Sequence, residues 1–94
     1  MEIAGRPKLD DLAAAHADVR SAVGAWIAEV LEAHWTGPVD IKARYSTASF
    51  LENNRVIFNL KGTKYRVETT VAYNTGIVVV SWAGTHAEYS KRES

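Results

Sequence analysis

Three strand-like segments that follow one another in the second half of the chain constrain its fold more than any other feature. Two of them alternate apolar and polar side chains, as half-buried strands do, and the third is apolar on both faces, like a central strand. Two short turns, each with a glycine that permits a positive φ angle, join the segments into successive hairpins. The pattern predicts a small antiparallel sheet, with strands at residues 55–60, 64–73 and 77–83.

A helical layer is predicted ahead of this sheet. A proline near its start suits the first turn of a short helix over residues 7–15. Apolar residues at a 3.6-residue spacing predict a longer helix over residues 18–35, which Gly37 and Pro38 would end. One or two further helical turns are expected at residues 38–45.

The remaining segments are short. Residues 2–4 are a candidate for an edge strand, and residues 46–53 are predicted to be a loop. Because 94 residues allow only one core, we expect a single domain over residues 1–94. Its predicted class is α+β, with two layers: N-terminal helices packed on one face of a small antiparallel sheet.

The composition excludes several kinds of site. There is no cysteine, so disulfides and thiolate metal sites are ruled out. We find no carboxylate cluster at metal-ligand spacing, no phosphate-cradling glycine loop and no nucleophile elbow, so neither a metal nor a cofactor is expected. The longest apolar run, residues 77–80, is too short to span a membrane, and the N-terminus has no apolar signal-peptide core. We therefore expect a cytoplasmic protein that does not contact a membrane.

The charges are unevenly distributed although the formal net charge is zero. Residues 1–52 carry three more acidic than basic side chains, and residues 53–94 carry three more basic than acidic ones. This division is compatible with a basic face for an anionic partner, and equally with chance.

The polar cluster after the third strand suggests acid/base chemistry on a phosphodiester. In RNA, such a bond is cut when the 2′-OH is deprotonated and attacks the adjacent phosphorus, which requires proton transfer and cations at the phosphate. His86 is the candidate acid/base, because imidazole titrates near neutral pH, and the alternative is a surface histidine that caps the strand. Arg66 and Lys64 alternate along one strand and are expected to share a face, where they would bind the phosphate unless that face is merely solvated.

Other residues of this half have weaker assignments. Tyr89 would stack on a base or assist proton transfer, or else pack in the core, and Glu88 would orient His86 or be solvated. Trp82 either lines the catalytic face or packs in the core, and Lys61 either contacts the RNA backbone or is a plain turn lysine. The histidines at positions 16 and 34 lie on or beside apolar helical stripes, and both are interpreted as structural.

Four segments of the chain resemble the signature segments of the HigB-type toxins of bacterial toxin–antitoxin operons, which belong to the wider RelE-like superfamily of mRNA interferases. The segments are Trp35–Lys42 (WTGPVDIK), Asn53–Leu60 (NNRVIFNL), Gly62–Val67 (GTKYRV) and Gly84–Tyr89 (GTHAEY). The resemblance extends from about Ala25 to Lys91.

The resemblance implies a RelE-like fold and a specific activity. Such toxins enter the A site of the 70S ribosome and cut the mRNA there without a metal. Their partner is a helix-turn-helix antitoxin of the HigA type, and the pair binds operator DNA through the antitoxin. His86, Arg66, Lys64 and Tyr89 are then the catalytic candidates, and the RNA-binding candidates are Lys61, Asn54, Arg55 and Lys91.

Two features leave an alternative open. Ser90 stands where the family usually has an acidic residue, and the chain is neutral where family members are typically basic. These features fit a catalytically silent binding module that acts with an antitoxin as a transcriptional co-repressor. A third possibility is an RNA-binding protein that does not need the ribosome.

Overall fold

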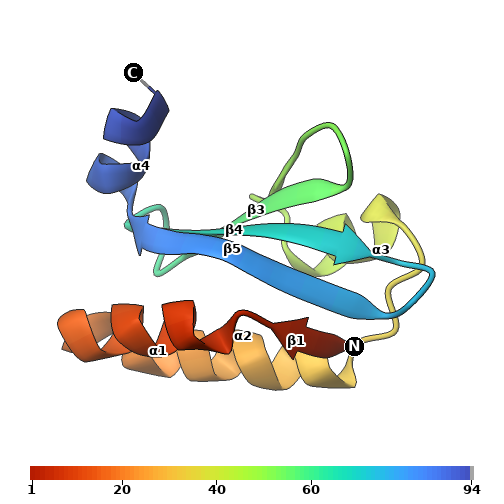
Figure 1. Cartoon of the computed structure of the whole chain (residues 1–94), viewed down its shortest axis with the longest axis horizontal. Helices are drawn as coiled ribbons and strands as arrows, with labels where there is room; N and C mark the ends of the chain where they lie inside the picture. Colours follow the sequence, from red (N-terminus) through yellow and green to blue (C-terminus); the bar gives the residue numbers. More distant parts are fainter. Residues whose placement is uncertain (94) are drawn as a thin grey trace.

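The two predicted hairpins form the centre of the sheet in the structure, a computed structural model that describes residues 1–93. The elements occur in the order β1 (Glu2–Ala4), α1 (Arg6–Ala15), η1 (Ala17–Val19, a single 3₁₀ turn), α2 (Arg20–Glu32), α3 (Pro38–Arg44), β2 (Ser49–Phe50), β3 (Arg55–Leu60), β4 (Tyr65–Ala72), β5 (Ile77–Thr85) and α4 (His86–Glu93). The predicted α+β class, with N-terminal helices on one face of the sheet, is confirmed (Figure 1).

The sheet has five strands in the order β1-β5-β4-β3-β2. The three central strands pair antiparallel, as predicted, but β1 pairs parallel with β5, so the expectation of a purely antiparallel sheet is wrong at that edge. The whole helical layer separates β1 from β5 along the chain, and such a connection can return a strand in parallel. β2 lies within the predicted loop, where Asn53 and Asn54, both with φ of 60°, turn the chain back onto β3.

A register shift in β5 decides which side chains share a face. Glu68 pairs with Trp82 whereas the next residue of β4, Thr69, pairs with Val80, so Ser81 is an extra residue in β5. Val80 therefore faces the helices and is 1% exposed, whereas Trp82 lies on the other face of the sheet. Alternation alone would have placed Val80 and Trp82 on the same face.

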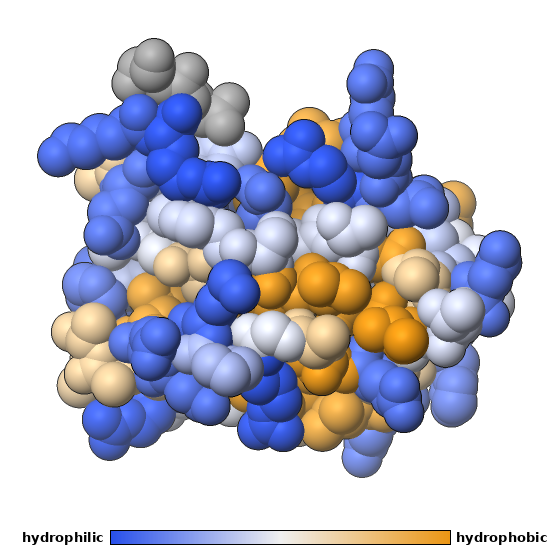
Figure 2. All heavy atoms as spheres, in the orientation of Figure 1, coloured by the Kyte–Doolittle hydropathy of each residue, from blue (hydrophilic) through white to orange (hydrophobic). Residues whose placement is uncertain are grey.

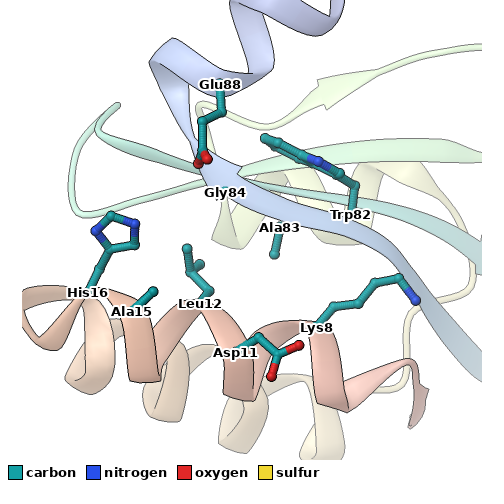
Figure 3. Close-up of a pocket in the computed structure, with 9 residues that line it drawn as sticks. All are labelled: Lys8, Asp11, Leu12, Ala15, His16, Trp82, Ala83, Gly84 and Glu88. Atoms are coloured by element: carbon teal, nitrogen blue, oxygen red, sulfur yellow. The ribbon is translucent and has the colours of Figure 1, made fainter.

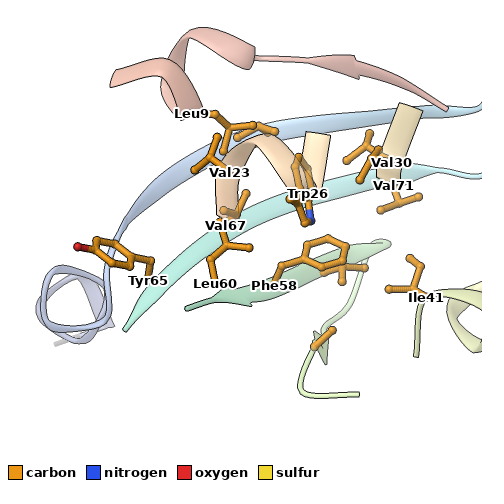
Figure 4. Packing of buried hydrophobic residues seen from close by; sticks show 14 of the residues in the cluster. Leu9, Val23, Trp26, Val30, Ile41, Phe58, Leu60, Tyr65, Val67 and Val71 are labelled. Atoms are coloured by element: carbon orange, nitrogen blue, oxygen red, sulfur yellow. The ribbon is translucent and has the colours of Figure 1, made fainter. Parts of the chain in front are cut away.

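Helices α1 and α2 lie on one side of the sheet, and the hydrophobic core lies between them and the strands (Figures 1 and 4). α2 ends at Glu32, three residues before its predicted end, because Ala33 adopts an extended backbone. The extended segment brings Trp35 into the core, where its ring stacks on Phe58 with centroids 6.1 Å apart. α3 confirms the helical turns that were predicted at residues 38–45, and it buries Ile41.

The last helix, α4, was not predicted. It lies at one end of the sheet, on the side opposite α1 and α2 (Figure 1). Figure 2 shows hydrophobic residues gathered over the middle of the face that β5 crosses, and hydrophilic residues where α4 lies. The catalytic and RNA-binding candidates in α4 therefore lie at a polar end of the molecule.

Gly5 joins β1 to α1 at a close approach to β5. Its φ angle is 83°, and a Cβ atom at this position would collide with the carbonyl oxygen of Val80. We expect Gly5→Ala to lower the free energy of unfolding by about 2–3 kcal/mol, because it adds backbone strain to a steric clash.

Chemical denaturation measures this loss, and Gly24→Ala is the matched control. Gly24 is exposed on α2, and a Cβ atom added there would meet no other atom within 4 Å. Alanine there should leave stability unchanged or raise it by up to about 1 kcal/mol. Equal stabilities for the two variants would contradict the steric explanation for Gly5.

Candidate active site

The end of β5 and the start of α4 hold His86 in a defined place. The side-chain oxygen of Thr85 accepts a hydrogen bond from the Glu88 backbone N–H (3.1 Å), and the Glu88 carboxylate accepts one from the Thr85 backbone N–H (2.8 Å). This reciprocal pair is a capping box, which starts the helix at His86. The backbone N–H of His86 also donates to the carbonyl oxygen of Lys64 (2.9 Å), so the histidine lies beside the β3–β4 turn.

The imidazole of His86 is exposed. Among the residues that the structure describes, its side chain makes no hydrogen bond or ion pair. It lines an open hollow of about 600 Å³, whose lining residues are Lys61, Thr63, Lys64, Thr85, His86 and Ala87. Both ring nitrogens are therefore available for proton transfer to a bound molecule.

Arg66 lies on the face of β4 that is turned away from α1 and α2, directly opposite Gly84 in β5. Its guanidinium carbon is 4.7 Å from the centroid of the Tyr89 ring. It makes no ion pair within residues 1–93, and its buried Nε has no hydrogen-bond partner. The neighbouring Asn59 also has a buried side-chain oxygen without a partner. Arg66 is thus a positioned cation with unused donors, which suits it to bind an anion.

Tyr89 contacts Arg66 and follows His86 by three residues in α4. Its ring is 8% exposed and packs against Trp82 with centroids 5.7 Å apart. Residues three apart on a helix are neighbours on its surface, so Tyr89 lies one turn below His86 on α4. We call His86, Arg66 and Tyr89 the α4 cluster: the Tyr89 ring contacts Arg66 and follows His86 by one helical turn, and His86 itself lines the hollow beside the β3–β4 turn.

Lys64 does not belong to the α4 cluster. It lies in the turn before β4, and its ammonium donates to the Asp18 carboxylate of η1 (2.8 Å). The expectation that Lys64 and Arg66 share a strand face is therefore wrong. Lys61, with φ of 54°, lies in the same turn and donates to the backbone oxygen of Asp18 (3.0 Å), and alternation cannot anticipate such contacts.

Comparison with known families identifies the chain. A family model described as "HigB_toxin, RelE-like toxic component of a toxin-antitoxin system" matches residues 19–92. The chain belongs to the HigB toxin family. No similar curated protein sequence was found. As the toxic component of such a system, this HigB toxin has an antitoxin as its partner.

The predicted RNA-binding residues of this HigB toxin are distributed over two places. Asn54 is in the β2–β3 turn, where its carbonyl oxygen accepts a hydrogen bond from the Val71 N–H (2.9 Å). Arg55 follows it and lies 3.6 Å from the Glu68 carboxylate. Lys61 is in the β3–β4 turn, and Lys91 is exposed on α4. Only Lys61 and Lys91 therefore lie on the elements that carry or adjoin His86.

Sequence reasoning missed a network on the same sheet face as Arg66. Glu68 is 9% exposed and lies between two arginines, since Arg92 of α4 also donates to it (3.4 Å). Arg92 lies over the Trp82 ring, 4.6 Å from its centroid. These contacts fix α4 on the sheet. Trp82 thus lines the face of the α4 cluster, which was one of its two predicted placements.

The other histidines lie elsewhere. His16 is half-buried at the end of α1, with its ring 5.3 Å from the Tyr65 ring, and it lines a hollow of about 300 Å³ between α1 and β5 (Figure 3). His34 is exposed after α2, so it does not belong to the buried stripe. Within residues 1–93, no group of three or more His, Cys, Asp or Glu side chains is arranged to hold a metal ion. The described helices include none that is both long and apolar enough to cross a membrane.

The side chain of Glu88 extends from α4 toward Gly84 (Figure 3), and its carboxylate is part of the capping box. The hydrogen bonds from Thr85 hold the pKa of this carboxyl below its usual range. We expect Glu88→Ala to lower the free energy of unfolding by about 1 kcal/mol, the scale of a helix cap. Glu88→Gln should lose less, because the amide oxygen still accepts from Thr85.

The pH dependence distinguishes this carboxylate from a neutral acceptor. A folded-state pKa below the unfolded value adds stability above the unfolded pKa, and this contribution is lost as the pH falls through the folded pKa. The stability difference between the wild type and Glu88→Gln should therefore be constant at neutral pH and disappear in acid. A difference that stays constant throughout the acid range would contradict the assignment.

Proposed function

We propose that this HigB toxin is a ribosome-dependent mRNA endonuclease that needs no metal ion. The observation that supports it best is the α4 cluster: an exposed imidazole lies one helical turn from a tyrosine, and the ring of that tyrosine contacts an arginine that has no carboxylate partner within residues 1–93. Proton transfer and phosphate binding are the two functions that cutting RNA through its own 2′-OH requires.

Both the attacking oxygen and the leaving oxygen of the proposed reaction belong to the RNA. The 2′-oxygen loses its proton and bonds to the adjacent phosphorus, and the bond from phosphorus to the 5′-oxygen breaks. The 5′-oxygen takes up a proton, so the products are a 2′,3′-cyclic phosphate and a 5′-OH. His86 acts as the acid/base, and Arg66 binds the phosphate as its charge increases.

Tyr89 has a double role in this proposal. Its ring positions the Arg66 guanidinium by a cation–π contact. Its hydroxyl makes no hydrogen bond with the described residues, so it is available to the substrate. Lys64 lines the same hollow as His86 but donates to the Asp18 carboxylate, and we assign it to the RNA backbone beside the reacting phosphate.

The ribosome would bring the mRNA to a chain that attracts free RNA only weakly. A net charge of zero gives little general attraction to free RNA, whose binding depends on neutralised phosphates. We therefore propose that the toxin acts in the cytoplasm on mRNA that the 70S ribosome presents in its A site. A helix-turn-helix antitoxin of the HigA type is proposed as its partner, and operator DNA would be bound only through that complex.

A purified translation system tests this proposal. The protein is added to a defined mRNA with and without 70S ribosomes, and the 3′ ends are mapped. We expect cuts that depend on translating ribosomes and are in phase with codons. Cuts in naked RNA would favour the ribosome-independent RNA-binding protein, and no cuts by folded protein would favour the silent co-repressor.

A further inference from the structure

The β3–β4 turn carries a site where several donors converge on one carboxylate. Asp18 of η1 accepts hydrogen bonds from the Lys64 ammonium (2.8 Å) and from the Tyr65 hydroxyl (2.6 Å). The Lys61 ammonium donates to the backbone oxygen of Asp18 (3.0 Å) and lies 3.8 Å from its carboxylate. Two cations and a hydroxyl around one anion also form a suitable set of donors for a phosphate group.

The position of this site links it to the α4 cluster. Lys61 and Lys64 line the same hollow as His86, and the carbonyl oxygen of Lys64 accepts the His86 backbone N–H. An RNA strand whose scissile phosphate lies at His86 would therefore place a neighbouring phosphate within reach of these two lysines. In the structure Asp18 already holds both of them.

The contacts with Asp18 can be exchanged. The side chains remain partly exposed, at 36% for Asp18, 49% for Lys61 and 62% for Lys64. Ion pairs that are open to water contribute little to stability, because water solvates both partners. Asp18 also lies in a single 3₁₀ turn, one residue before the match to the HigB family begins.

We propose that Lys61 and Lys64 form a binding site for an RNA backbone phosphate, and that Asp18 occupies this site as an internal competitor until RNA displaces it. The inference rests on the proposed function, since it takes RNA as the ligand. Such a competitor would lower the affinity of the chain for free RNA although basic residues lie beside its histidine. The lysines become available when an RNA strand is held against them, by the ribosome or at a saturating concentration of RNA.

The test is the binding of a short single-stranded 2′-O-methyl RNA, which cannot be cut through a 2′-OH, to Asp18→Asn in the absence of ribosomes. The amide keeps an oxygen for the Tyr65 hydroxyl but releases the two lysines. At low salt we expect the RNA to bind about three- to tenfold more tightly than to the wild type. The slope of log affinity against log salt should steepen by about 1.4, since each contact with a single-strand phosphate contributes about 0.7.

The matched control is Asp10→Asn, which changes the net charge equally at an exposed position of α1. It should bind RNA nearly as the wild type does, and Lys61→Gln with Lys64→Gln should abolish the gain of Asp18→Asn. An equal gain in both Asn variants, or a gain that survives loss of the lysines, would overturn the proposal. Weaker binding by Asp18→Asn would also overturn it, because Asp18 would then fix the turn for RNA rather than compete with it.

The wild-type protein gives an independent readout that does not depend on how a variant folds. The bonds from Lys64 and Tyr65 lower the pKa of Asp18 to about 2. Adding the 2′-O-methyl RNA should raise this pKa toward 3.8, as NMR of the carboxyl carbon would show, and an unchanged pKa at saturating RNA would overturn the proposal. Because neither measurement uses cleavage, a failed nuclease assay with positive binding results would reject the proposed activity and leave the Asp18 site standing.

Discussion

His86→Ala should lower the rate of ribosome-dependent mRNA cleavage by about 10²–10⁴-fold, the usual contribution of a general acid or base. The imidazole is exposed and forms no hydrogen bond with the described residues, so its removal takes nothing from the packing. The free energy of unfolding should stay within about 0.5 kcal/mol of the wild type. Single-turnover cleavage on programmed ribosomes, together with chemical denaturation, measures both quantities.

The matched control is His34→Ala, at an exposed histidine after α2 that does not line the His86 hollow. It should cut mRNA at the wild-type rate. If His86→Ala also cuts at that rate, His86 is not the acid/base. If His86→Ala is inactive because it is unfolded, the denaturation curve shows it.

Trp26→Ala should lower the free energy of unfolding by about 3–5 kcal/mol, enough to unfold a domain of marginal stability. Trp26 is 1% exposed at the centre of the core, and its ring meets Phe58 edge to face with centroids 5.3 Å apart (Figure 4). Truncation removes this contact and leaves a cavity between α2 and β3. Denaturation followed by circular dichroism measures the change.

Trp26→Phe is the informative comparison. The indole N–H of Trp26 is buried without a hydrogen-bond partner among the described residues, so removing this N–H should not by itself lower the free energy of unfolding. Phenylalanine keeps most of the apolar contact, and we expect it to retain most of the stability that alanine loses. Equal destabilisation by the two substitutions would contradict a packing role for this ring.

The elements that depend on local pattern were predictable. β3 was predicted at its observed bounds, because alternation and a glycine turn are both visible in sequence. The end of α2 was not, because it depends on Trp35 packing against Phe58, which is distant along the chain. β2 was missed because it has only two residues and depends on the left-handed backbone of the adjacent asparagines.

The candidate site, like the fold, was predictable from the sequence only in part. His86, Arg66 and Tyr89 were selected from the sequence; the structure places His86 and Tyr89 one helical turn apart and Arg66 against the Tyr89 ring, and their roles remain predictions. Lys64 was placed wrongly because its partner, Asp18, is 46 residues away and lies in a turn. α4 was missed although the sequence contained its signal: a threonine followed three residues later by glutamate, at Thr85 and Glu88, is a capping box.

Cleavage by the α4 cluster requires the 2′-OH of the nucleotide on the 5′ side of the scissile phosphate. The measurement is the cleavage of ribosome-bound mRNA that carries a single 2′-deoxynucleotide at that position, beside the all-ribose mRNA. The proposed chemistry predicts that the all-ribose mRNA is cut at the mapped site and that the substituted mRNA is not cut there. Equal cutting of both would show that another nucleophile attacks the phosphorus, and the proposed roles of His86 and Arg66 would then be wrong.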